Sequence, residues 1–135
     1  MILMQNQPKE VDKGLLRTMT LGQLSVLLSS FRFRFVTEND LQDGIEAVFA
    51  NAQVPYQREQ SLNVSDRPDF MVMGIAIEVK TKGSLADLLR QASRYAGNSE
   101  VSAILVVGSP HWLVRVPTEL AGKPVRAVRL IGSLL

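Results

Sequence analysis

The stretch Arg67-Pro68-Asp69-Phe70-Met71-Val72-Met73-Gly74-Ile75-Ala76-Ile77-Glu78-Val79-Lys80 decides the fold of this chain. Its second half favours a β-strand, in which successive side chains point to opposite faces of a sheet. The alternation separates two sets of residues, with Ile75, Ile77 and Val79 on one face and Ala76, Glu78 and Lys80 on the other. Glu78 and Lys80 are therefore expected to be neighbours in space.

The preceding run from Asp69 to Met73 also favours a strand, and Gly74 can supply the tight reversal between the two strands. Pro68 suits the start of a strand, where no ladder donor is needed. The pattern predicts a β-hairpin that lays Asp69 beside the Glu78 end of its partner strand.

Two carboxylates held this close repel each other, and a divalent cation removes that penalty. Asp69, Glu78 and the main-chain carbonyl of Val79 offer the hard oxygen ligands that Mg²⁺ takes, and Mn²⁺ is expected to substitute. The other coordination positions would remain for water and phosphate oxygens. Lys80 would then orient the water, stabilise hydroxide or offset charge on a phosphate under attack.

A helix is predicted before the hairpin, because Thr37-Glu38-Asn39-Asp40 has the pattern of a capping box. An apolar stripe follows at helical spacing, made by Leu41, Ile45, Val48, Phe49 and Ala52. Glu46 falls on the margin of this stripe, where it could reach a site at the sheet edge. A solvated helical glutamate is the alternative.

A second helix is predicted from Leu85 to Ala96, with Ser84 as its cap. Gln91 and Tyr95 lie along one flank of its apolar face, whereas Arg90 and Arg94 point toward solvent. This flank could meet the active site and a nucleic-acid strand together. An exposed glutamine and a half-buried core tyrosine are the alternatives.

The pattern of Pro68-Asp69 followed by Glu78-Val79-Lys80 resembles the PD-(D/E)xK nuclease superfamily. Gln91 and Tyr95 are similar to the QxxxY element of its RecB-like branch. The resemblance covers about Thr37 to Gly108 and implies an α/β fold with a restriction-endonuclease-like αβββαβ core, in which helices flank a mixed central sheet. In this family a helical glutamate often adds a metal contact, and Glu46 is the matching position.

The resemblance also implies an activity and a setting. We expect Mg²⁺-dependent hydrolysis of DNA phosphodiester bonds, selective for DNA structure, in repair, recombination or phage DNA metabolism. Small stand-alone members of the family work as homodimers, so a homodimer in a bacterial or phage-infected cytoplasm is expected. An RNA-directed nuclease and a nucleic-acid-binding module without cleavage are the alternatives.

Basic residues near the motif are candidate contacts for phosphates flanking the cut. The expected nucleic-acid-binding residues are Lys82, Arg90, Arg94 and Tyr95. For Arg90 and Arg94, a merely solvated helix face is an equal alternative. A second basic region follows, and its relation to the first is not evident from the sequence; it contains Arg115, Lys123, Arg126 and Arg129.

Composition sets the outer limits on function. The chain has 135 residues, which suits one domain at 21–135 after a partly flexible extension at 1–20. It has no cysteine and one histidine, which excludes thiolate zinc sites, a cysteine nucleophile and a multi-histidine metal centre. No phosphate-binding glycine loop is present, so no nucleotide cofactor is expected. No convincing membrane segment appears.

Four further strands are predicted around this core. Pro55 to Leu62 reads as a strand that pairs with the hairpin, and Ser102 to Gly108 reads as a buried strand. Trp112 to Val116 is predicted as a short strand, and Val125 to Ile131 as a strand at the sheet edge.

Overall fold

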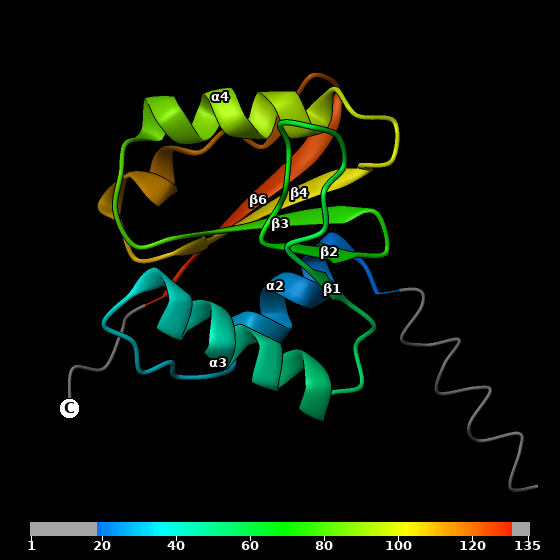
Figure 1. The fold of residues 1–135 in the computed structure, drawn as a ribbon. Helices are drawn as coiled ribbons and strands as arrows, with labels where there is room; N and C mark the ends of the chain where they lie inside the picture. Colours follow the sequence, from blue (N-terminus) through cyan, green and yellow to red (C-terminus); the bar gives the residue numbers. More distant parts are fainter. Residues whose placement is uncertain (1–18, 131–135) are drawn as a thin grey trace, which may run out of the picture.

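A six-stranded mixed β-sheet forms the centre of the structure, and helices cover both of its faces (Figure 1). The structure is a computed structural model and describes residues 19–130, so most of the expected extension at 1–20 lies outside the described residues. In chain order the elements are α2 (Leu21–Ser29), α3 (Glu38–Asn51), β1 (Gln57–Arg58), β2 (Phe70–Val72), β3 (Ile75–Lys80), α4 (Leu85–Ala96), β4 (Ala103–Gly108), the 3₁₀ helix η1 (His111–Arg115), β5 (Glu119–Leu120) and β6 (Lys123–Arg129).

The strands lie in the order β1-β2-β3-β4-β6-β5. The first three pair antiparallel, and β3, β4 and β6 run parallel to one another. β5 pairs antiparallel with the start of β6. The predicted α/β class with a mixed sheet flanked by helices is therefore confirmed, and the run α3-β1-β2-β3-α4-β4 has the expected order of elements.

The two faces of the sheet bury two separate hydrophobic cores. α2 and α3 pack on one face, against a set that includes Ile75, Ile77 and Val79. α4 and η1 pack on the other, together with Ala76. The predicted alternation along β3 is thus confirmed, and Glu78 belongs to the face covered by α4.

Both predicted helix starts are confirmed. The Thr37 hydroxyl accepts a hydrogen bond from the Asp40 amide at 3.1 Å, and the Asp40 carboxylate accepts one from the Thr37 amide at 3.1 Å. This reciprocal capping box starts α3 at Glu38. Ser84 caps α4, which spans the predicted Leu85–Ala96.

The hairpin turns through Met73 and Gly74, whose φ values are 51° and 86°. A two-residue turn with positive φ at both positions matches the right-handed twist of the flanking strands. The predicted reversal at Gly74 is therefore confirmed, and the register pairs Phe70 with Ile77.

Three sequence predictions about strands need correction. The strand expected from Pro55 to Leu62 is only β1, because the chain leaves the strand conformation at Glu59, where φ is 55°. The strand expected at Trp112–Val116 is wrong, since η1 forms there and buries Leu113 against α4. The strand expected at the sheet edge, β6, lies between β4 and β5.

None of the helices within residues 19–130 has both the length and the apolar composition that crossing a membrane requires.

Candidate active site

Asp69 and Glu78 lie where the hairpin opens, at the end of β3 and just before β2. The Oδ2 atom of Asp69 accepts a hydrogen bond from the Val79 amide at 2.7 Å, which fixes this carboxylate beside the end of β3. Glu78 is only 4% exposed, and the Nζ atom of Lys80 lies 3.5 Å from its Oε2 atom. The structure therefore brings together Asp69, Glu78 and Lys80, as the sequence predicted.

The Val79 carbonyl also faces this site. In a β-strand the N–H and C=O of one residue point to the same side, and the Val79 amide points toward Asp69. Extending the pairing of Phe70 with Ile77 places Pro68 opposite Val79. Pro68 has no N–H to donate, so it cannot use the Val79 carbonyl as a ladder partner. This oxygen is available beside the two carboxylates.

Tyr95 and Gln91 hold Glu78 from α4. The Tyr95 hydroxyl donates to Oε1 of Glu78 at 2.9 Å, and the Gln91 amide donates to the Tyr95 hydroxyl at 2.9 Å. Tyr95 is 1% exposed. Burial raises the pKa of Tyr95 well above its usual range, so the hydroxyl remains a donor. Gln91 thus lies where it was expected, but Tyr95 acts on Glu78 and has no surface to offer a nucleic acid.

Both carboxyl groups resist ionisation in this environment. Burial raises the pKa of Asp69 to about 6, and the charge of Glu38 adds to the effect against the opposing hydrogen bond from Val79. Burial and then the charge of Asp69 raise the pKa of Glu78 to about 7, although Lys80 and Tyr95 favour its charged form. The pair therefore favours a cation that would share the negative charge.

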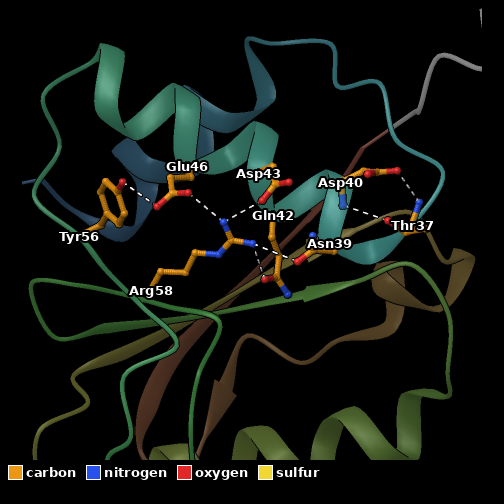
Figure 2. Close-up of polar contacts among 8 residues, drawn as sticks. All are labelled: Thr37, Asn39, Asp40, Gln42, Asp43, Glu46, Tyr56 and Arg58. Atoms are coloured by element: carbon orange, nitrogen blue, oxygen red, sulfur yellow. Dashed lines mark hydrogen bonds and ion pairs between the residues drawn. The ribbon is translucent and has the colours of Figure 1, made fainter.

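Glu46 was expected to assist at this site, but both of its carboxylate oxygens bond to residues outside the acidic pair (Figure 2). Its Oε1 atom accepts from Arg58 at 2.9 Å, and its Oε2 atom accepts from Tyr56 at 2.8 Å. Arg58 also pairs with Asp43 at 2.8 Å and lies over the ring of Phe70. Both oxygens of Glu46 are engaged in this cluster, which joins α3 to β1.

Glu38 is the helical glutamate that reaches the site. It is the first residue of α3, and its Oε1 atom accepts from the Thr81 amide at 3.0 Å, one residue beyond β3. Its charge acts on Asp69. From the sequence, Glu38 is expected only as part of the helix cap. A helix start often points toward the end of a neighbouring strand, and this tendency could have identified Glu38 as a site residue.

The basic residues expected to contact phosphates differ in whether they have an acidic partner. Arg90 pairs with Asp87 on the same helix, and Arg94 donates to the buried Asp66 at 2.9 Å. These two arginines are therefore partly neutralised by their own chain. Lys82 is exposed in the loop after β3 and has no ion pair within residues 19–130. The same loop is joined to η1, because the indole N–H of Trp112 donates to the Gly83 carbonyl at 2.9 Å.

A polar cavity of about 350 Å³ opens beside Gln91 and Tyr95. The loop from Ser61 to Arg67 supplies the rest of its lining, including Asp66. The cavity therefore lies beside the two α4 residues whose hydrogen bonds lead to Glu78.

The donor set fits a hard divalent cation. It consists of two carboxylates and one main-chain oxygen, which suits Mg²⁺ because this ion keeps several of its waters. Within residues 19–130 no three acidic or histidine side chains gather as a preformed metal cluster. The fit therefore depends on the Val79 carbonyl and water in addition to Asp69 and Glu78.

The fold and this site define an α/β protein with a buried acidic pair and a lysine at the open end of a hairpin. No family model, curated protein or solved structure matches the chain.

Proposed function

We propose that this protein is a metal-dependent nuclease with a restriction-endonuclease-like core, which hydrolyses phosphodiester bonds in DNA. The observation that carries the proposal is the placement of Asp69, Glu78 and Lys80 around the open end of one hairpin. A protein that only bound a polyanion would have no physical need for a buried pair of carboxylates there. The order α3-β1-β2-β3-α4-β4 supports the same class.

Each residue has a role in this proposal. Asp69, Glu78 and the Val79 carbonyl would hold Mg²⁺, which when bound supplies an activated water and offsets charge on the phosphate. The Val79 amide fixes one oxygen of Asp69, which leaves the other oxygen for the metal. Tyr95 fixes Oε1 of Glu78, so that Oε2 turns toward Lys80.

Lys80 places a positive charge beside the reacting phosphate. Its ammonium group can donate to the attacking water or to a phosphate oxygen, both of which gain negative charge in the reaction. In this position Lys80 affects the rate of cleavage rather than the affinity for DNA. Structure-selective cutting, a role in DNA repair, recombination or phage DNA metabolism, and a homodimer remain predictions from the resemblance.

The test is a panel of labelled substrates incubated with Mg²⁺, Mn²⁺ or EDTA. The panel contains duplex, flapped, four-way and single-stranded DNA, with RNA of the same sequences. We expect cleavage of DNA with either metal and none with EDTA. Cleavage of RNA alone would favour the RNA-directed alternative, and metal-independent binding without any cleavage would favour the binding module.

Substitutions of the three site residues test whether cleavage depends on this site. Asp69→Asn, Glu78→Gln and Lys80→Ala are each expected to reduce cleavage by about 100-fold or more. Lys80→Ala should leave DNA binding nearly intact. Glu100→Gln is the matched control, because Glu100 is an exposed carboxylate with no ion pair within residues 19–130. Equal activity of all four variants would overturn the proposed site.

A further inference from the structure

Lys80, Gly108 and Arg129 form one row across three neighbouring parallel strands. Lys80 pairs with Gly108 at the end of β3 and β4, and Gly108 pairs with Arg129 at the end of β6. Paired residues in a sheet direct their side chains to the same face. Arg129 is therefore on the same face as Lys80, and its Cα atom lies two strand spacings away, about 10 Å.

The middle of this row has no side chain. A Cβ atom at Gly108 would collide with the main-chain oxygen of Lys80, so the close approach of β4 to β3 requires glycine. Gly108 is itself buried, so this row reaches the surface only at its two ends, Lys80 and Arg129. A strand of nucleic acid passing this end of the sheet would meet Lys80 and then Arg129.

A short chain of hydrogen bonds fixes Arg129 relative to Lys80. The Ser109 amide donates to the Lys80 carbonyl at 3.1 Å, and the Nε atom of Arg129 donates to the Ser109 carbonyl at 3.2 Å. The terminal N–H groups of this exposed arginine have no hydrogen-bond partner within residues 19–130. Arginine presents these groups as a planar fork that suits phosphate oxygens.

The surrounding segments lack negative charge. Neither Val101–Thr118 nor Leu120–Leu130 contains an aspartate or glutamate. Arg58, Arg90 and Arg94 all have acidic partners, whereas Arg129 has none in the described part of the chain. An unpaired arginine, held beside the site by a main-chain oxygen, favours an anionic ligand.

We propose that Arg129 binds a backbone phosphate of the substrate DNA strand, on the β6 side of the scissile phosphate. The substrate strand thus runs along the end of the parallel strands, from the carboxylate pair past Lys80 toward Arg129. Arg129 is a binding residue and takes no part in the chemical step. This inference rests on the proposed nuclease function and adds the direction in which the substrate lies.

Arg126 is the matched control on the same strand. It pairs with Leu105, which belongs to the core on the opposite face, and its guanidinium lies near Gly22 of α2. Both arginines are exposed and three residues apart, but only Arg129 is in the row with Lys80. Removal of either one changes the net charge equally.

The first experiment measures binding of a fluorescein-labelled DNA to Arg129→Ala and Arg126→Ala in EDTA, over a range of salt concentrations. Arg129→Ala should weaken binding roughly tenfold, and Arg126→Ala by much less. The slope of log affinity against log salt should decrease by about one for Arg129→Ala. Arg129→Lys should recover part of the affinity.

The second experiment replaces single phosphates near the cut by uncharged methylphosphonates. One position within about three nucleotides of the cut should weaken binding to the unmodified protein and to Arg126→Ala, but not to Arg129→Ala. RNA of the same sequence is run in parallel to show whether the contact is specific to DNA.

The outcomes separate this inference from the function on which it rests. Cleavage by the unmodified protein, combined with equal binding by Arg129→Ala and Arg126→Ala, would overturn the role of Arg129 alone. Absence of both cleavage and binding on every substrate would overturn the nuclease function and the role of Arg129 together. Selective loss of affinity in Arg129→Ala supports the role, whether or not cleavage is seen.

Discussion

Asp69 and Glu78 are costly residues in the metal-free protein. Both carboxyl groups are buried, and the charge of Asp69 disfavours ionisation of Glu78. Their raised pKa values, about 6 and about 7, reflect the free-energy cost of ionising them in the folded protein. Tyr95, Lys80 and the Val79 amide offset only part of it. A side chain kept at such a cost is better explained by a ligand than by stability.

The raised pKa values predict that the stability of the folded protein depends on pH. Because both pKa values are above the usual 3.8 and 4.5, the folded state binds these protons more tightly than the unfolded state. Their contribution to stability is complete below pH of about 4 and is lost as the pH rises through about 6 to 7. In EDTA, the melting temperature should therefore fall between about pH 5 and about pH 8.

Glu78→Gln should remove about half of this decrease, because glutamine keeps the shape and cannot ionise, whereas Asp69 still ionises. Glu100→Gln should retain it. Mg²⁺ should raise the melting temperature more at about pH 8 than at about pH 5, since it binds the charged carboxylates. Differential scanning calorimetry in both buffers measures these changes, and a profile in Glu78→Gln identical to that of the unmodified protein would contradict the assignment.

At the scale of elements, α3 has two different glutamates with two different tasks. Glu38 at its first turn reaches the end of β3, whereas Glu46 near its middle joins Arg58 of β1 (Figure 2). Arg58 is largely enclosed, and its Nε atom is buried without a partner within residues 19–130. Glu46 is therefore part of a charged cluster that attaches the helix to the sheet.

The two glutamates predict opposite phenotypes. Glu38→Gln should raise the Mg²⁺ concentration needed for half-maximal cleavage several-fold, because a negative charge near Asp69 is lost. Its effect on stability should be small, since glutamine can still accept from Thr81. Glu46→Gln should lower the free energy of unfolding by about 1–3 kcal/mol and leave the Mg²⁺ requirement unchanged.

Magnesium titrations of cleavage and urea denaturation of both variants decide this prediction. If Glu46→Gln alone shifts the Mg²⁺ requirement, then Glu46 and not Glu38 assists the metal.

The elements that the sequence predicts well are those whose signals are local. The capping box of α3, the Ser84 cap of α4, the alternation along β3 and the turn at Gly74 each depend on residues close together in the sequence, and all are confirmed. The position of Glu46 depends on Arg58, a residue from a distant strand. No spacing along α3 could reveal that partner, which is why Glu46 was predicted at the site.

At the scale of the whole molecule, helices cover both faces of the sheet (Figure 1). The sheet separates two hydrophobic cores, and the site lies on the face of the α4 core. Tyr95 is both a member of the α4 core and the hydrogen-bond partner of Glu78. The α2–α3 core lies on the far face. Packing of α4 should therefore matter more to the site than packing of α2.

Leu88 and Leu28 test this difference, since both are leucines with at most 1% exposure. Leu88→Ala in the α4 core and Leu28→Ala in the α2–α3 core should each cost about 2–5 kcal/mol of stability. At a temperature where both variants are folded, Leu88→Ala should lose more cleavage activity, because it loosens the helix that holds Tyr95 and Gln91. Equal residual activity in the two variants would show that the site does not depend on its own core.

The relation between the strands could not be predicted from the sequence. β6 was expected at the sheet edge, but it pairs with β4 and has β5 on its other side. Parallel pairing depends on contacts between distant segments, and alternation within one strand does not identify its neighbours. The row of Lys80, Gly108 and Arg129 follows from that pairing, so only the structure relates the second basic region to the site.

The hydrogen bond between Trp112 and Gly83 has a practical consequence. Trp112 is the only tryptophan in the chain, and it contacts the loop that follows Lys80. Its indole is therefore a natural fluorophore beside the site. Changes in its emission would follow the arrival of a cation or an oligonucleotide in real time, without any label on the protein.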